Sequence, residues 1–329
     1  MSMEEMVMKA LASVKQEDVL HDYRPFLVIY KDGKVQKFLG NFSVPPSIDT
    51  VTGVESKDVV ISSETGVYVR MYKPQSIKPG EKVPLLVYFH GGGFVVESAS
   101  SPPYHSYLNA LTSKANVIGV SVNYRLAPEH PLPAAYDDAW AALEWVRRAD
   151  EPWLKEHVDM GRVFLAGDSA GANIAHHMAK WASSCDTGVK LVPKGIVLVH
   201  PFFWGGERIG SEARKMTAGE KGPSGALADK LWKLVNPGTS GSDDPMLNPG
   251  MDPELETLAG EKVLVLVAEK DALRDRGFHY KEVLQKSGWK GEVEVVETKE
   301  ENHVFHLINP ASPKAAHLME QFVSFLNSS

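Results

Sequence analysis

The sequence is nearly without cysteine. Its 329 residues include a single one, Cys185, so the chain can form no internal disulfide. Because persistent disulfides belong to oxidising compartments, this favours a reducing one, and we expect a cytoplasmic location. The first twenty residues carry charges such as Glu4, Lys9 and Asp18 and lack the apolar run of a secretory signal. The sequon Asn41-Phe42-Ser43 is therefore not expected to be glycosylated.

The sequence also lacks an excess of positive charge and any long apolar run. Lys and Arg total 35 against 42 for Asp and Glu, a net charge of -7. This balance argues against nucleic acid or an anionic membrane as a partner, and no stretch is long enough to span a bilayer. Apolar residues make up 43% and charged residues 23%, which is typical of a soluble globular protein. We expect one domain over residues 1–329, as a monomer or small homo-oligomer.

Short apolar runs alternate with helical stretches from Val83 onward. Runs of this kind are typical of strands buried on both faces in a parallel sheet with crossover helices. The expected strands are 83–89, 117–122, 163–166, 196–199, 263–268 and 292–297, and the expected helices are 104–114, 134–148, 170–183 and 314–326. Two antiparallel strands at 57–62 and 67–72 and a hairpin at 26–38 precede them, joined by an irregular linker at 43–52.

One segment breaks this alternation. Residues 204–253 are rich in Gly, Pro, Ser and Asp, with one expected helix near 226–235. The segment is too long for a simple connection between strands and is read as an insertion. We expect it to form a cap together with the N-terminal residues, about 1–45, where an amphipathic helix is predicted.

The stretch Gly167-Asp168-Ser169-Ala170-Gly171 follows an apolar run and precedes a helix-compatible one. A buried strand that turns sharply into a helix would raise Ser169 to the apex of the turn, as in a nucleophile elbow. Gly167 and Gly171 lack a Cβ, so neighbouring segments can approach closely there. The pattern predicts that Ser169 is a nucleophile, provided the chain supplies a base, an acid and oxyanion donors.

Three glycines follow the expected strand 83–89, in His90-Gly91-Gly92-Gly93-Phe94. They could form a tight turn or a phosphate-binding loop, but they lack the spacing of a dinucleotide fingerprint and the Lys-Ser/Thr of a P-loop. We therefore predict an oxyanion hole made of the backbone amides of Gly92, Gly93 and Ala170.

The acid and the base are expected later in the chain, in that order. Asp271 follows the strand 263–268 and is the favoured acid, with Asp275 and Glu269 as alternatives. His303 follows the strand 292–297 and is the predicted base, and His306 is expected to be structural. The remaining histidines lack metal-ligand spacing, so we predict no metal site and no cofactor.

With these residues identified, the sequence resembles the plant carboxylesterases of the hormone-sensitive-lipase-like branch of the α/β-hydrolases. The resemblance covers nearly the whole chain. It rests on Pro25–Gly33, His90–Phe94, Tyr124–Glu129, Gly167–Gly171, His200–Phe203, Asp271–Asp275 and His303–Phe305. It implies an α/β-hydrolase fold with a mostly parallel eight-stranded sheet, flanking helices and a cap. In this family Tyr124–Glu129 would brace the loops near the site.

The same family includes proteins that are not esterases. Gibberellin receptors replace the catalytic histidine, isoflavanone dehydratases carry Thr at the elbow, and some alkaloid cyclases lose the base. This sequence has Ser169, Asp271 and His303 together, which favours ester hydrolysis through an acyl-enzyme. A cyclase or eliminating lyase of plant specialised metabolism, and a small-molecule hormone receptor, are the alternatives.

The predicted substrate is a small apolar ester. Its pocket would be lined by apolar side chains near the glycine loop, the insertion and the base. The candidates are Phe94, Val95, Val96, Phe202, Phe203, Trp204, Leu231, Trp232 and Val304.

Overall fold

A computed structural model describes residues 3–184, 191–213 and 225–328. Cys185 lies outside these ranges. In the described part of the chain, no helix is both long and apolar enough to cross a membrane.

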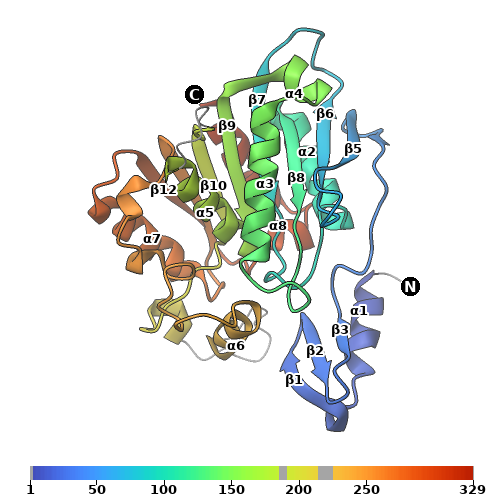
Figure 1. The fold of residues 1–329 in the computed structure, drawn as a ribbon, viewed down its shortest axis with the longest axis vertical. Coiled ribbons are helices and arrows are strands. Elements are labelled where there is room, and N and C mark those ends of the chain that lie inside the picture. The colour runs from blue at the N-terminus through green and yellow to red at the C-terminus, as the bar shows by residue number, and fades with distance from the viewer. Residues whose placement is uncertain (1–2, 185–190, 214–224, 329) are drawn as a thin grey trace.

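The centre of the molecule is a nine-stranded sheet in the order β12-β11-β10-β9-β7-β8-β6-β5-β4 (Figure 1). The six strands from β7 to β12 run parallel to one another, whereas β4, β5 and β6 are antiparallel. The expectation of a mostly parallel sheet is confirmed. The sheet has nine strands where eight were expected. The additional strand, β4, has two residues and lies inside the predicted linker. The strands are β4 Ile48–Asp49, β5 Val54–Val60, β6 Tyr68–Pro74, β7 Val83–Phe89, β8 Ile118–Asn123, β9 Val158–Asp168, β10 Gly195–Val199, β11 Lys262–Ala268 and β12 Glu292–Thr298.

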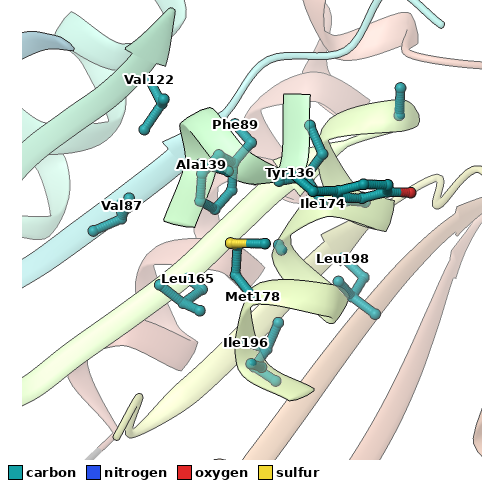
Figure 2. Close-up of a cluster of buried hydrophobic side chains, with 14 of the residues drawn as sticks. Val87, Phe89, Val122, Tyr136, Ala139, Leu165, Ile174, Met178, Ile196 and Leu198 are labelled. Atoms are coloured by element: carbon teal, nitrogen blue, oxygen red, sulfur yellow. The ribbon is translucent and has the colours of Figure 1, made fainter. Parts of the chain in front are cut away.

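Helices cover both faces of this sheet, because successive side chains of a strand point to opposite sides. In β7, Leu85, Val87 and Phe89 pack into one apolar cluster, while Leu86 and Tyr88 pack into the other. Figure 2 shows the first cluster, where side chains of α3 and α5 meet those of β7, β9 and β10. The second cluster lies under α2 and α9. The helices of the body are α2 Pro102–Ala115, α3 Ala134–Arg148, α4 Pro152–His157, α5 Ala170–Ser184, α7 Arg274–Ser287, α8 Phe305–Ile308 and α9 Pro313–Asn327.

The two expected cap segments lie at the same end of the molecule (Figure 1). The N-terminal segment contains α1 (Met3–Ala12) and an antiparallel sheet of β1 (Val19–Tyr23), β2 (Leu27–Tyr30) and β3 (Val35–Lys37). The insertion contains α6 (Gly225–Val235), which contacts β1. Lys37 pairs with Glu129 at 2.8 Å, and this ion pair connects the N-terminal sheet to the body.

Candidate active site

Ser169 lies between the end of β9 and the start of α5, at a backbone φ of +52°. A non-glycine residue in this left-handed region is uncommon and strained, so the surrounding chain must hold it there. The Ser169 amide donates to the Val199 carbonyl of β10 at 2.8 Å. A Cβ on Gly171 would lie 2.0 Å from the Phe89 carbonyl oxygen, and one on Gly167 would lie 2.3 Å from the backbone of Gly171. The crowding explains why both flanking positions are glycine.

His303 and Asp271 reach Ser169 from the ends of two further strands. His303 Nε2 lies 2.9 Å from Ser169 Oγ, and its Nδ1 lies 2.6 Å from Asp271 Oδ2. Asp271 comes shortly after β11, where the Leu273 amide donates to its Oδ1 at 3.0 Å, and His303 comes after β12. With Nδ1–H donating to Asp271, the lone pair on Nε2 accepts from the Ser169 hydroxyl. The structure thus brings the three predicted residues into one hydrogen-bonded line.

The two alternative acids lie elsewhere. Asp275 is in the first turn of α7 and pairs with Arg274 at 2.7 Å. Glu269 accepts from the Glu300 amide at 2.8 Å and pairs with Lys299 at 3.2 Å. Of the three carboxylates, Asp271 is the one that contacts His303.

The charges of the acid and the base are coupled. Burial opposes protonation of His303, but the Asp271 carboxylate outweighs it and raises the pKa of His303. Burial likewise disfavours ionised Asp271, yet the charge and hydrogen bond of His303 lower the pKa of this carboxyl. Asp271 is therefore set to remain a carboxylate while His303 gains and loses a proton.

A third carboxyl group, Asp168, lies beside the nucleophile and was not among the predicted site residues. It is 1% exposed and accepts hydrogen bonds from Tyr88 Oη at 2.9 Å and Tyr104 Oη at 2.8 Å. Burial raises its pKa to about 6. The Tyr104 hydroxyl also accepts from the Gly91 amide at 2.8 Å. One chain of hydrogen bonds therefore joins the elbow to the glycine loop.

The glycine loop passes over the elbow in a conformation that needs glycine. Gly92 and Gly93 have φ values of +98° and +62°. His90 stacks on Tyr124 with ring centroids 4.2 Å apart, and Tyr124 Oη donates to the His90 carbonyl at 2.6 Å. This is the bracing that the family resemblance implied. Within the described ranges, the amides of Gly92 and Gly93 donate to no protein acceptor. Ala170 is the first residue of α5, where amides have no partner within the helix.

Two further histidines lie behind His303. His200 has a φ of +46°, and its Nδ1 accepts from the Val304 amide at 3.0 Å. His306 is 1% exposed and packs against the ring of Tyr107. His200, Asp271 and His303 bring potential metal ligands within 4.8 Å of one another. However, both ring nitrogens of His303 are used by Asp271 and Ser169, and His200 Nδ1 accepts from the Val304 amide. Only His200 Nε2 lacks a partner among the described residues, so the donor set fits a hydrogen-bonded cluster better than a metal centre.

The predicted pocket residues fall into two groups. Phe94 packs against Phe202 and Trp232, with ring centroids 6.5 and 6.4 Å away, and a Cβ on Gly93 would lie 2.8 Å from Leu231 Cδ2. These residues lie next to the glycine loop. By contrast, Phe203 stacks on Tyr280 of α7 with centroids 5.0 Å apart.

The other members of the set are placed individually. Trp204 is fully buried and donates to Asp229 at 3.1 Å. Val95 and Val96 are buried in the first apolar cluster. Val304 has a φ of +49° and is half-buried beside His303.

Comparison with known proteins agrees with this geometry. The model of the α/β-hydrolase fold family matches residues 86–307. "Probable carboxylesterase 2" of Arabidopsis thaliana is 47% identical over 92% of this chain and 95% of that protein. "Tuliposide A-converting enzyme 1, chloroplastic" of Tulipa gesneriana is 44% identical over 94% of this chain and 78% of that protein.

Solved esterases share the fold. The thermostable carboxylesterase EstE1, cloned from a metagenomic library, superimposes with a TM-score of 0.71 at 28% identity, covering 87% of this chain and 90% of its own. The hyperthermophilic esterase of Pyrobaculum calidifontis gives a TM-score of 0.69 at 30% identity, covering 84% and 85%. The chain therefore belongs to the α/β-hydrolase family and groups with the plant carboxylesterases.

Proposed function

We propose that the protein is a serine carboxylesterase that hydrolyses small esters with apolar acyl groups. One observation carries the proposal, namely the line from Ser169 Oγ through the His303 imidazole to Asp271, with steps of 2.9 and 2.6 Å. A serine hydroxyl is a weak nucleophile at neutral pH and needs both an adjacent base and a group that orients the base. Membership among the plant carboxylesterases supports the same reaction.

The reaction begins with attack of Ser169 Oγ on the ester carbonyl carbon while His303 Nε2 takes the hydroxyl proton. The tetrahedral intermediate collapses, the carbon–oxygen bond to the alcohol breaks, and the alcohol leaves with the proton from Nε2. Water then loses a proton to Nε2 and attacks the acyl-serine. The second collapse releases the carboxylic acid and returns the proton to Ser169. Asp271 stabilises the imidazolium in both halves.

The amides of Gly92, Gly93 and Ala170 are the proposed donors to the oxyanion in each intermediate. The positive φ values of the two glycines and the position of Ala170 at the start of α5 support this role. Removing one such donor costs about 3–4 kcal/mol of transition-state stabilisation in comparable enzymes. The reaction needs no cofactor in this scheme.

The proposal is tested by turnover of p-nitrophenyl acetate and butyrate. Ser169→Ala should lose at least roughly 10³-fold in kcat, because the residual oxyanion donors cannot replace a nucleophile. Ser324→Ala, on the exposed face of α9, is the matched control and should keep wild-type activity. A serine-directed fluorophosphonate should label wild type at Ser169, seen by mass spectrometry. A wild-type protein with neither turnover nor an adduct would refute the proposal, and unlabelled tight binding of a hormone-like ligand would support a receptor instead.

A further inference from the structure

The peptide group that leads into the glycine loop is held at both ends by tyrosine hydroxyls. Its carbonyl, that of His90, accepts from Tyr124 Oη at 2.6 Å, and its N–H, that of Gly91, donates to Tyr104 Oη at 2.8 Å. The carbonyl and the N–H of one trans peptide lie in a common plane and point in opposite directions. The two hydrogen bonds therefore fix the orientation of this plane directly before the proposed oxyanion donors.

The glycines themselves do little to fix the loop. A glycine has wide freedom in both backbone angles, so Gly92 and Gly93 can follow a rotation of the peptide group before them. Gly91 cannot carry a side chain, because a Cβ there would lie 2.4 Å from Asp168 Oδ2 and 2.9 Å from Tyr104 Oη. The direction in which the loop amides point therefore depends on contacts from neighbouring elements.

Tyr104 is mounted rigidly, and its hydroxyl has fixed roles. It lies in the first turn of α2, after Pro102 and Pro103, whose rings restrict the backbone there. An amide can only donate and a carboxylate can only accept, so the buried Tyr104 hydroxyl accepts from Gly91 and donates to Asp168. Burial and the charge of Asp168 raise the pKa of Tyr104 well above its ordinary value of about 10, so the hydroxyl keeps its proton.

Asp168 connects this hydroxyl to the nucleophile. Asp168 is the residue directly before Ser169, and its second oxygen accepts from Tyr88 Oη at 2.9 Å. The glycine loop and the elbow are therefore anchored to the same buried carboxyl group. Attack on a carbonyl carbon requires that the serine oxygen and the oxyanion donors keep a fixed separation, and a shared anchor maintains it.

We propose that Tyr104 is a positioning residue of the oxyanion hole, which holds the Gly91 peptide group so that the amides of Gly92 and Gly93 point at the oxyanion. Tyr104 acts through the glycine loop and not through contact with the reacting atoms. Without its hydroxyl the buried Gly91 amide loses its partner, and the peptide group can rotate toward another one. The inference rests on the proposed esterase function and deepens it.

Three matched exchanges of tyrosine for phenylalanine separate this role from packing. Tyr104→Phe removes the hydrogen bonds to both Gly91 and Asp168, whereas Tyr88→Phe removes a hydrogen bond to Asp168 alone. Tyr107→Phe, also on α2, removes a buried hydroxyl that has no hydrogen-bond partner among the described residues.

The first measurement is kcat/KM for p-nitrophenyl butyrate. It should fall at least about ten-fold further in Tyr104→Phe than in Tyr88→Phe, since one lost hydrogen bond is worth about one factor of ten. The loss should stay below the roughly 10²–10³-fold that follows complete removal of an oxyanion donor, because the amides of Gly92 and Gly93 remain. Tyr107→Phe should keep the wild-type value.

The second measurement uses a mimic of the tetrahedral intermediate, a trifluoromethyl ketone with a butyl chain. Ser169 Oγ bonds to its carbonyl carbon, the hydroxyl proton passes to His303 Nε2, and the carbonyl oxygen becomes an oxyanion. The corresponding trifluoromethyl alcohol has the same chain but cannot form this bond. Tyr104→Phe should weaken inhibition by the ketone by a factor similar to its loss of kcat/KM and leave inhibition by the alcohol unchanged, because only the ketone needs the oxyanion hole.

A variant with p-aminophenylalanine in place of Tyr104 keeps the shape of the side chain and serves if Tyr104→Phe fails to fold. Its amino group still donates to Asp168, but it turns a second N–H toward the Gly91 amide, so that a donor faces a donor. This variant should show the same losses of kcat/KM and of ketone affinity as Tyr104→Phe.

Equal kcat/KM in Tyr104→Phe and Tyr88→Phe, with an active wild type, would overturn the positioning role and leave the esterase function standing. An equal loss of affinity for ketone and alcohol would also overturn it, since the damage would then lie in the pocket. Full activity of a folded p-aminophenylalanine variant would do the same. A wild-type protein that neither hydrolyses the ester nor adds to the ketone would refute the proposed function and this role with it.

Discussion

At the scale of single residues, His303 exchanges the proton and Asp271 sets its pKa. The free imidazole is the active base, and the Asp271 carboxylate raises the pKa of His303 against the effect of burial. Activity should therefore rise with pH through a midpoint above the ordinary histidine value of about 6.5. Asp271→Asn should move this midpoint down and lower kcat by roughly 10⁴-fold, as the loss of the orienting carboxylate does in serine proteases. The measurement is the pH profile of kcat/KM for both proteins.

The matched control for this experiment is Asp275→Asn. Asp275 is the neighbouring carboxylate on α7, and it pairs with Arg274 rather than with His303. Its replacement should leave kcat within about two-fold of wild type, because this partly buried ion pair does not contact His303. A larger loss of kcat in Asp275→Asn than in Asp271→Asn would mean that Asp271 is not the acid that orients His303.

Asp168 should influence both catalysis and stability. Its negative charge helps to raise the pKa of His303, so Asp168→Asn should shift the acid limb of the pH profile downward. Burial raises the pKa of Asp168 to about 6. Protonated Asp168 therefore stabilises the fold at a pH below the usual carboxyl range, and this contribution to the free energy of unfolding is lost as the pH rises through about 6. Asparagine cannot ionise, so the Asp168→Asn variant does not lose stability in this pH range. From about pH 4 to about pH 7, the difference in unfolding free energy should move in favour of the variant by roughly 2–3 kcal/mol.

Urea unfolding of the two proteins across this pH range tests the stability effect. Asparagine has the same shape but only one acceptor oxygen, whereas Tyr88 and Tyr104 donate to different oxygens of Asp168. The lost hydrogen bond adds an offset that does not change with pH, so the change of the difference with pH reports the charge. A difference that stays constant with pH would mean that Asp168 is already ionised without cost in the folded protein.

Asp271 and Asp168 show what the sequence could and could not predict. Ser169, Asp271 and His303 could be found because each follows a recognisable strand in the chain order that the elbow motif demands. Asp168 was visible in the motif, but its partners Tyr88 and Tyr104 lie 80 and 64 residues away along the chain. No local pattern predicts such a contact. The burial of His200 and His306 behind the site was equally hidden, because burial follows from tertiary packing.

At the scale of elements, the turn from β9 to α5 depends on close backbone contact. Gly171→Ala would place a Cβ 2.0 Å from the Phe89 carbonyl oxygen, where backbone and not a mobile side chain must give way. We expect a loss of about 3 kcal/mol or more in unfolding free energy, together with loss of activity. Gly238→Ala is the control, since no atom lies within 4 Å of the added Cβ. It should change stability by no more than about 0.5 kcal/mol. Equal stability of the two variants would contradict the packing described at the elbow.

Most elements could be predicted from periodicity, and the misses have physical causes. β9 begins at Val158 and not at the predicted Val163. Its first residues include the polar Asp159 and Arg162, which are only partly buried and interrupt the apolar run. β4 has two residues, too few to show any alternation, so the sequence predicts only a linker there. The continuous apolar strands were found because both of their faces are covered.

At the scale of the whole molecule, segments distant in the chain meet above the glycine loop. A Cβ on Gly93 would lie 2.8 Å from Leu231 of α6 and 3.7 Å from Phe26 of the N-terminal segment. The Leu132 amide also donates to the Val235 carbonyl at the end of α6, at 2.8 Å. The N-terminal segment and the insertion thus bring apolar side chains to the proposed oxyanion donors.

Shortening Leu231 should therefore enlarge the space for the acyl group. Leu231→Ala should raise the ratio of kcat/KM for p-nitrophenyl octanoate over acetate by roughly ten-fold, as expected when a few methylenes gain room. Lys233→Ala, an exposed residue of the same helix, is the control and should leave the ratio unchanged. An unchanged ratio in Leu231→Ala, with the protein folded, would remove α6 from the substrate pocket.

The order of the strand ends also determines when activity can first exist. Ser169, Asp271 and His303 follow β9, β11 and β12, and β12 is an edge strand that pairs with β11. During synthesis the nucleophile leaves the ribosome 134 residues ahead of its base. The line from Ser169 to Asp271 is complete only when β12 pairs with β11 and brings His303 to the site. Ester turnover therefore reports that this edge strand has joined the sheet.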